Sequence, residues 1–159
     1  MPLFPANAAD FEGDDAVRKW EEVEVRLPPP PQPAGLVAFY VSAATDNRFF
    51  IDLDSVSSGS DGVVRYTLVV VSAAGVRNVS FEGMRCETRE RRLYAFGRSD
   101  GTWSKSRNNQ WERVRESASN RHHAALFQDY FCPDGVIVRN ADEARDALRR
   151  GGRPSTAGS

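Results

Sequence analysis

The sequence predicts an α+β fold, in which one or two C-terminal helices pack on a curved antiparallel sheet of about five or six strands. Two observations predict it. Short apolar runs separated by turn residues occupy the chain up to residue 98, and helical spacing of apolar residues replaces them further on. A chain of 159 residues has the length of one domain. We place that domain at residues 20–150, between a flexible segment 1–19 and a disordered tail 151–159.

The sequence of the first part of the domain, residues 20–62, predicts three strands and two connections. Residues 20–27 alternate apolar and charged side chains, as in a half-buried strand. The proline run at residues 28–33 predicts a stiff polyproline II connector, because each ring restricts the backbone and removes an N–H donor. Residues 36–41 predict a buried strand and residues 49–51 a further short one. Residues 52–62 are rich in Ser, Asp and Gly, which predicts a loop.

Residues 63–72 carry the strongest strand prediction. Val, Tyr and Thr dominate there and apolar residues occupy both faces, as expected of a central strand. Residues 77–86 and 91–98 are the next two strands, and the short links between all three favour an antiparallel meander. Strict alternation places Cys86 opposite the apolar side chains of its strand, and a bulge at Gly83 would bring it to their face.

The pattern changes after residue 103. Residues 104–110 are polar and basic, which predicts a loop, and residues 111–115 suit either a strand or the start of a helix. Apolar side chains spaced by four residues predict a helix over residues 120–131, ended by Pro133. A short strand is expected over residues 136–138.

A final helix is predicted to begin after Asn140. Asn140 suits the N-cap position, and Glu143 completes a capping-box arrangement with it. Alanines and Leu148 give this helix an apolar face, and Gly151 ends it.

Composition excludes several classes of protein. The chain has 21 basic and 22 acidic residues and a formal net charge of -1, so no strong overall attraction to nucleic acid or anionic lipid is expected. No apolar run approaches the ~20 residues of a membrane-spanning helix. The sequence has no CxxC, no Cys/His ligand cluster and no phosphate-binding glycine loop. We therefore predict no metal site and no cofactor.

Cys86 and Cys132 are the two cysteines of the chain. They are either buried free thiols or one disulfide, and the compartment decides between the two. We expect a disulfide between the end of a predicted strand and the end of a predicted helix, which would stabilise the fold by about 4 kcal/mol. A catalytic thiol at Cys132 is the rival hypothesis, but its apolar neighbours disfavour the reactive thiolate.

The N-terminal residues bear on the compartment. Ala6 and Ala8 form the small-x-small pattern that signal peptidase cuts, and an acidic stretch follows. No basic region and no full apolar core precede this pattern. The segment is interpreted either as the remnant of a signal peptide that starts upstream or as an ordinary flexible N-terminus.

His122 and His123 are the two histidines, and they are adjacent. Neighbours on a helix point about 100° apart, so the two rings do not chelate one ion together. With Asp129 as a carboxylate of the right type, either ring is a candidate general base for a hydrolase-type reaction. We prefer a pair of structural histidines on a helix face, because no nucleophile motif such as GxSxG accompanies them.

The one charge asymmetry lies between residues 85 and 121, where arginine and lysine outnumber the acidic residues and tryptophans are interleaved. Charge combined with stacking suits a polyanion or a single-stranded nucleic acid. The candidate binding residues are Arg98, Trp103, Arg107, Trp111 and Arg121. Because acidic residues are mixed in, a solvated sheet edge with local ion pairs is the preferred interpretation, and nucleic acid is not an expected partner.

Several blocks of the sequence resemble the cryptic neisserial protein-like family of Gram-negative envelope proteins, over residues 20–150. The blocks are FYVS (39–42), TDNRFF (45–50), DGVVRYTLV (61–69), EGMRC (82–86), LYAFG (93–97), DGTWS (100–104), NRHHA (120–124) and DYFCP (129–133). The resemblance implies an exported protein, often a predicted lipoprotein, with no established activity. The chain departs from it in lacking a complete signal peptide and a lipobox cysteine. In layout, the chain is also similar to the surface-adhesin protein E group.

We therefore expect a non-enzymatic protein of the cell envelope, in the periplasm or associated with the outer membrane, that binds an unidentified protein or the cell surface. The alternatives are a hydrolase-type enzyme that uses His122 or His123 and a polyanion binder. A concave pocket that holds a histidine of perturbed pKa would favour an enzyme. An exposed aromatic or basic patch without such a pocket would favour a binder.

Overall fold

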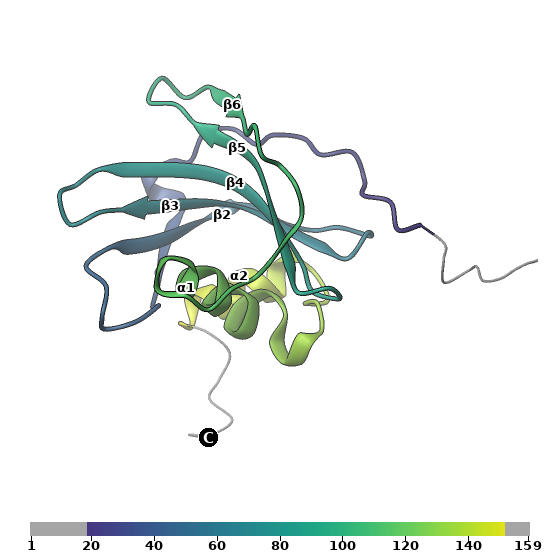
Figure 1. Ribbon diagram of the computed structural model, residues 1–159. Helices are drawn as coiled ribbons and strands as arrows, with labels where there is room; N and C mark the ends of the chain where they lie inside the picture. Colours follow the sequence, from purple (N-terminus) through teal and green to yellow (C-terminus); the bar gives the residue numbers. More distant parts are fainter. Residues whose placement is uncertain (1–18, 152–159) are drawn as a thin grey trace, which may run out of the picture.

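The computed structural model describes residues 19–151, and its strands form a curved antiparallel sheet in the order β1-β2-β3-β4-β5-β6 (Figure 1). Consecutive strands pair along the chain, while β7 pairs with the opposite end of β5 from β6. The predicted α+β class and the meander are confirmed. The strands are β1 (Leu36–Phe39), β2 (Arg48–Ser58), β3 (Val63–Val71), β4 (Arg77–Arg85), β5 (Glu90–Gly97), β6 (Trp103–Lys105) and β7 (Glu112–Arg113).

Strand β3 lies in the middle of the sheet, as its sequence predicts. Its first seven residues are all buried, because one face packs on helices and the other is covered by an N-terminal segment. Tyr66 faces the helices and its ring packs 4.9 Å from that of Phe131, measured between centroids. Arg65, the residue before Tyr66, points to the opposite face, where its Nε donates to the Tyr94 hydroxyl.

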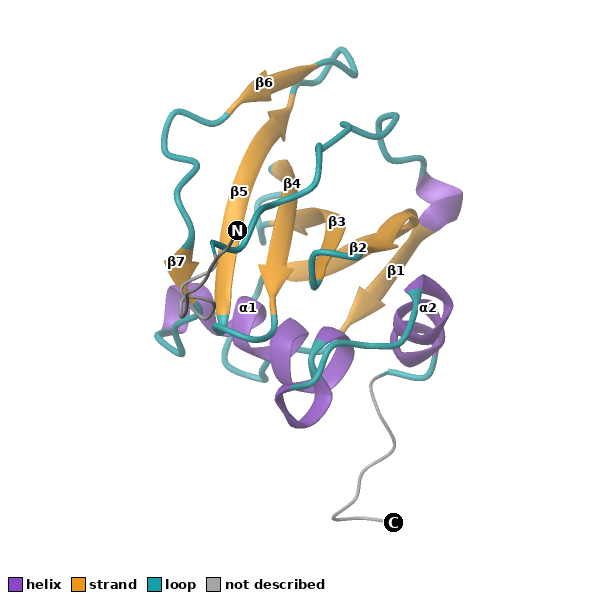
Figure 2. Cartoon of the chain, turned by 90° about the vertical axis from the view of Figure 1, so that its right-hand side faces the viewer, coloured by secondary structure: helices purple, strands orange, loops and turns teal. Residues whose placement is uncertain are grey.

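Helices cover one face of the sheet, and Figure 2 shows them gathered on that side. The predicted helix over residues 120–131 is present as α1 (Arg121–Ala125) followed by a π-helix, η3 (Leu126–Phe131). The π-helix continues to Cys132, whose N–H donates to the Phe127 carbonyl five residues back. Its wide turn buries two successive pairs of large side chains against the sheet: Leu126, Phe127, Tyr130 and Phe131.

The final helix is α2 (Ala141–Arg149), and it begins as predicted. The Asn140 side chain accepts a hydrogen bond from the Glu143 N–H at 2.9 Å. The Glu143 carboxylate, however, accepts from the N–H of Arg139 rather than from that of Asn140, so the reciprocal bond is shifted by one residue. Ala144, Ala147 and Leu148 form the buried face.

A disulfide joins Cys86, just after β4, to Cys132, just after η3, with 5.4 Å between their Cα atoms. This confirms the predicted pair. Cys86 already lies on the helix-facing side of β4 by strict alternation, so the predicted bulge at Gly83 is wrong. The irregularity lies in β5, where Phe81 pairs with Ala95 but Glu82 pairs with Leu93. Tyr94 is the extra residue of that bulge.

The predicted strand over residues 20–27 is wrong. This segment, which we call the strap (residues 19–27), forms no strand and crosses the face of the sheet opposite the helices (Figure 2). Its Val23 N–H donates to the Asp61 carboxylate instead of to a strand carbonyl, and Trp20 Nε1 donates to the Asp61 carbonyl. Side chains rather than a ladder of backbone bonds therefore attach the strap.

The predicted loop over residues 52–62 is wrong in its first half, because β2 continues to Ser58. The pairing of β2 with β3 is interrupted between Asp52 and Ser57, and polar side chains there bind backbone N–H groups that the interruption leaves unpaired. The Asp52 carboxylate accepts from the Asp54 N–H, and the Ser55 hydroxyl accepts from the Thr67 N–H of β3. Residues typical of a loop thus serve as a bulge inside a strand.

Three smaller predictions also meet the structure. The predicted loop over residues 104–110 is wrong at its start, where β6 pairs with β5. Of the two options for residues 111–115, the strand is correct, as β7. The predicted strand over residues 136–138 is wrong, since the Val138 N–H donates to the Phe131 carbonyl within the helical layer and Val136 is exposed.

The predicted flexible ends, 1–19 and 151–159, lie outside the described residues except for one residue each. Within residues 19–151, none of the helices has the length and apolar character needed to cross a membrane.

Candidate functional site

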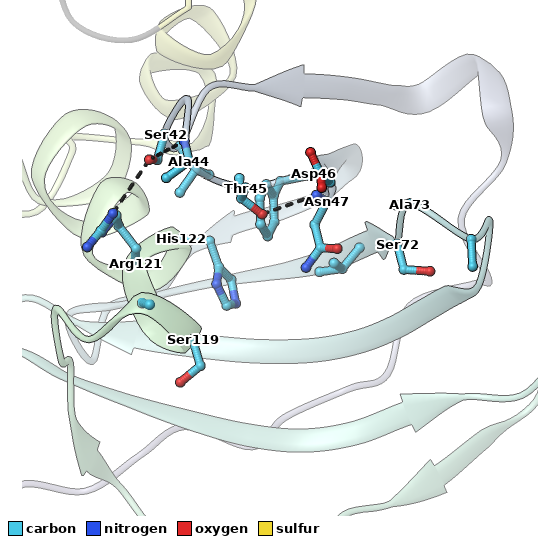
Figure 3. A pocket seen from close by; sticks show the side chains of 15 residues that line it. Ser42, Ala44, Thr45, Asp46, Asn47, Ser72, Ala73, Ser119, Arg121 and His122 are labelled. Atoms are coloured by element: carbon cyan, nitrogen blue, oxygen red, sulfur yellow. Dashed lines mark hydrogen bonds between the residues drawn. The ribbon is translucent and has the colours of Figure 1, made fainter.

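Three loops surround a hollow of about 540 Å³, which we call the His122 groove after the residue in its floor (Figure 3). One wall is the β1–β2 connection, including Ser42, Asp46 and Asn47. A second is the turn that follows β3, at residues 72–74, and the third is the start of the helical layer, at residues 118–122. The groove therefore lies where the sheet and the helices meet.

Serine and threonine hydroxyls stabilise the turns in these loops by accepting hydrogen bonds from backbone N–H groups. The Ser42 hydroxyl accepts from the Ala44 N–H at 3.0 Å, and the Thr45 hydroxyl accepts from the Asn47 N–H at 3.1 Å. In the second wall the Ser72 hydroxyl accepts from the Val76 N–H at 3.1 Å. The side-chain amide of Asn47, which lines the groove, has no hydrogen-bond partner among the described residues.

The His122 ring is held by aromatic contacts. It stacks on Phe49 of β2, with 5.1 Å between ring centroids and 18° between ring planes. The centroid of the His123 ring lies 4.0 Å from that of His122. Within residues 19–151 neither ring nitrogen of His122 has a hydrogen-bond partner. Burial, together with the neighbouring His123, lowers the pKa of His122 to about 4. The ring is therefore neutral near pH 7.

His123 points away from the groove into the core. Its Nε2 lies 3.0 Å from Oε1 of Glu82, which also accepts from the Tyr66 hydroxyl, while the other oxygen of Glu82 accepts from the Ser80 hydroxyl. Burial alone would raise the pKa of Glu82, but the charge and hydrogen bond of His123 and the charge of Arg91 lower it to about 2. Burial beside this carboxylate raises the pKa of Tyr66. The carboxylate that orients a histidine thus serves His123 and not His122.

Asp129, the third predicted catalytic residue, is exposed and does not line the groove. The structure brings the two imidazoles together but places a different carboxylate beside them. Glu82 was not singled out from the sequence. A glutamate in a half-buried strand is usually exposed, so no local signal marks its burial.

The five predicted basic and aromatic binding residues do not form one surface. Trp103 is half-buried under the proline run, where its Nε1 donates to the Pro28 carbonyl, and Arg98 donates to the Trp103 carbonyl. Trp111 packs edge-on against Trp20 of the strap. Arg107 lines a separate hollow beside β6, and Arg121 lies at the His122 groove. Both tryptophans are thus occupied in holding the N-terminal part of the chain.

A second polar cluster lies beneath the strap and was missed from the sequence. The Glu22 carboxylate accepts from Arg65 at 2.9 Å, and also from Arg92 and from the Tyr94 hydroxyl. Asp61 binds Arg65 from the other side at 2.7 Å. Burial alone would raise the pKa of Glu22, but the hydrogen bond from Tyr94, the hydrogen bond and charge of Arg65 and the charge of Arg92 lower it. An arginine inside the apolar run of β3 is the sequence signal of this buried pair.

Among residues 19–151, no three His, Cys, Asp or Glu side chains converge in a way that would hold a metal ion. We found no significant match among curated proteins or among solved structures. The model of the CNP1-like family matches residues 15–149, which include the strap, the whole sheet, the groove and both cysteines. This confirms the resemblance to the cryptic neisserial protein-like family, while the similarity to the protein E group stays a prediction. Because the match spans most of its length, the chain belongs to the CNP1-like family.

Proposed function

We propose that this protein is a non-catalytic binding protein of the cell envelope that holds a small polar ligand in the His122 groove. The groove volume of about 540 Å³ lies within the range of ~300–1,000 Å³ that is common for ligand pockets. Its lining combines apolar residues with a few polar groups that converge on the hollow, which is the usual composition of such pockets.

The observation that carries the proposal is the state of His122. A general base works best with a pKa near the working pH, whereas burial and His123 lower the pKa of His122 to about 4. A ring with so low a pKa is a weak base, and no carboxylate orients it within the described residues. A neutral imidazole is instead both a donor and an acceptor, which suits recognition of a polar ligand.

Hydrolysis is the second candidate, because a concave pocket with a histidine of perturbed pKa is what we expected of an enzyme. Serine hydroxyls also line the groove, including Ser119. A nitrophenyl ester assay of the protein and of the His122→Phe variant separates the two. Turnover that is lost in the variant would contradict the binding proposal.

The proposed location, in the periplasm or associated with the outer membrane, is supported by the disulfide. Disulfides form and persist in oxidising compartments and are rare in the cytosol. The test is fractionation of the native cell, followed by alkylation under denaturing conditions without reductant. We expect the protein in the envelope fraction with both cysteines protected, and recovery in the cytosol with two free thiols would contradict the location.

Binding is tested by blocking the groove. We expect some members of a library of amino acids, dipeptides, sugars and nucleosides to shift the NMR signals of residues around His122. Ala73 lines the groove, so Ala73→Trp should abolish these shifts. Val76 lies in the same turn but does not line the groove, so Val76→Trp is the matched control and should keep them. Shifts that survive in Ala73→Trp, or a library without effect, would contradict the proposal.

A further inference from the structure

Two side chains of opposite charge line the His122 groove. Among its 15 lining residues, Asp46 and Arg121 are the acidic and the basic one. Asp46 belongs to the turn before β2 and Arg121 begins α1, and Figure 3 shows them on opposite sides of His122. The two walls therefore present opposite charges to whatever lies between them.

Neither charge is neutralised within the described part of the chain. Arg121 makes one polar contact, a long hydrogen bond of 3.5 Å from its Nη1 to the Ser42 hydroxyl. Asp46 has no ion pair or hydrogen bond to its carboxylate within residues 19–151, and the two side chains do not pair with each other. By contrast, the arginines beneath the strap meet carboxylates of the chain itself.

This arrangement selects for ligands by charge. A ligand with a single negative charge would be attracted by Arg121 and repelled by Asp46, and the reverse holds for a single positive charge. A neutral sugar could hydrogen-bond to either side chain through its hydroxyls but would form no ion pair with them. A ligand with one charge of each sign, separated along its length, satisfies both walls at once.

The floor between the two charges suits an amide and a small apolar side chain. The Asn47 amide and the neutral His122 ring each offer a donor and an acceptor, as an amide requires. Phe49 and Val70 supply an apolar surface next to them. These groups complete the set that would recognise a peptide backbone.

Building on the proposed binding role, we propose that the His122 groove binds zwitterionic ligands of the amino acid and dipeptide class. The ligand carboxylate meets Arg121 and its ammonium group meets Asp46. The amide and side chain lie over Asn47, His122 and Phe49.

The charge requirement is tested with one dipeptide in three forms. Alanyl-alanine, its N-acetyl derivative and its C-terminal amide are titrated into the protein and followed by NMR. Exposed charge pairs contribute up to about 1 kcal/mol, so blocking either end should weaken binding by about fivefold. A disaccharide of similar size serves as the neutral probe and should not shift the groove signals.

Charge-neutral variants then assign each end. Arg121→Gln should bind the free dipeptide and its amide equally, and Asp46→Asn should bind the free dipeptide and its acetyl form equally. Arg48 is exposed and lies next to the groove without lining it, so Arg48→Gln is the control and should keep both preferences. Thermal unfolding of each variant checks that it is folded.

The outcomes separate this inference from the proposed function. If the free and blocked dipeptides bind equally, or the disaccharide binds in the groove and the dipeptide does not, the groove binds ligands but the zwitterion inference is wrong. If no member of the wider library shifts the groove signals, the proposed binding role fails and the inference fails with it.

Discussion

At the scale of single residues, Gly83 is required by a neighbour rather than by its own backbone. A Cβ atom at this position would lie 2.6 Å from the Tyr94 hydroxyl and 3.0 Å from a methyl group of Val63. We expect Gly83→Ala to lower the free energy of unfolding by about 1–3 kcal/mol, because overpacking forces the surrounding side chains to shift. Urea denaturation measures the loss.

The double variant identifies the cause of that loss. Tyr94→Leu removes the hydroxyl that a new Cβ would meet, so Gly83→Ala should destabilise the Tyr94→Leu protein less than it destabilises the natural one. Equal losses in both backgrounds would show that the glycine is needed for another reason.

The imidazole of His122 makes stability depend on pH. Its pKa is lowered from 6.5 to about 4 in the folded protein, so the unfolded chain binds the proton more readily. Stability should therefore fall as pH decreases from 6.5 to 4, by about 3 kcal/mol in total. His122→Phe keeps the stacking on Phe49 and removes this titration, so its stability at pH 4 and at pH 7 should differ less. Identical pH slopes in urea denaturation would contradict this.

Glu82 also makes stability depend on pH, but at lower pH than His122 does. Its folded pKa of about 2 lies below the ordinary 4.5, so its contribution is complete above pH 4.5 and is lost as pH falls towards 2. Glu22 and Asp61, whose pKa values are also lowered, contribute in the same pH range, so the change in acid sensitivity on adding Glu82→Gln to His122→Phe measures the share of this buried carboxylate.

At the scale of elements, the strap depends on one carboxylate. Glu22 binds Arg65, Arg92 and Tyr94, and its side chain is 12% exposed. Glu22→Gln leaves Arg92 without its carboxylate partner, so we expect a loss of about 1–3 kcal/mol in unfolding free energy. The strap should also detach more often, which would speed tryptic cleavage after Lys19 and Arg26.

Glu24, two residues further on, provides the matched control. It is exposed and has no ion pair within the described residues, so Glu24→Gln should leave both stability and cleavage rate unchanged. A Glu22→Gln protein that resists trypsin as well as the natural chain would show that Trp20 and Asp61 hold the strap without the carboxylate.

At the scale of the whole molecule, the disulfide ties the sheet to the helical layer behind it. It spans 46 residues of the chain, so in the loop-entropy model it stabilises the fold by about 4 kcal/mol. We expect the Cys86→Ala, Cys132→Ala double variant to lose stability of that order in urea denaturation. Reduction of the natural protein should produce a similar loss, and a difference below about 1 kcal/mol would contradict the model.

The distribution of charge over the whole molecule also shows why sequence proximity misled. Arg98, Arg107 and Arg121 lie within a short basic segment, yet the chain distributes them over three separate hollows. Trp103 and Trp111 lie between them in the sequence and are occupied by the proline run and the strap. A basic segment becomes a basic surface only if the fold turns its residues to one side.

Local patterns alone were enough for much of the fold. The three strands of the central meander follow from runs of β-branched and aromatic residues separated by short turns, and the Asn140 cap follows from its contact with Glu143, three residues further on. Such interactions depend on residues close in sequence, so their pattern is visible without the fold. The pairing of Cys86 with Cys132 could also be predicted, because the chain has no other cysteine.

Contacts between distant residues decided the rest. Glu22 meets Tyr94 across 72 positions, which turned an alternating segment into a strap instead of a strand. The His122 groove is assembled from three loops, and Glu82 reaches His123 across 41 positions. The free energy of such contacts depends on where the packed sheet and helices place each side chain, and neighbouring residues carry no record of that placement.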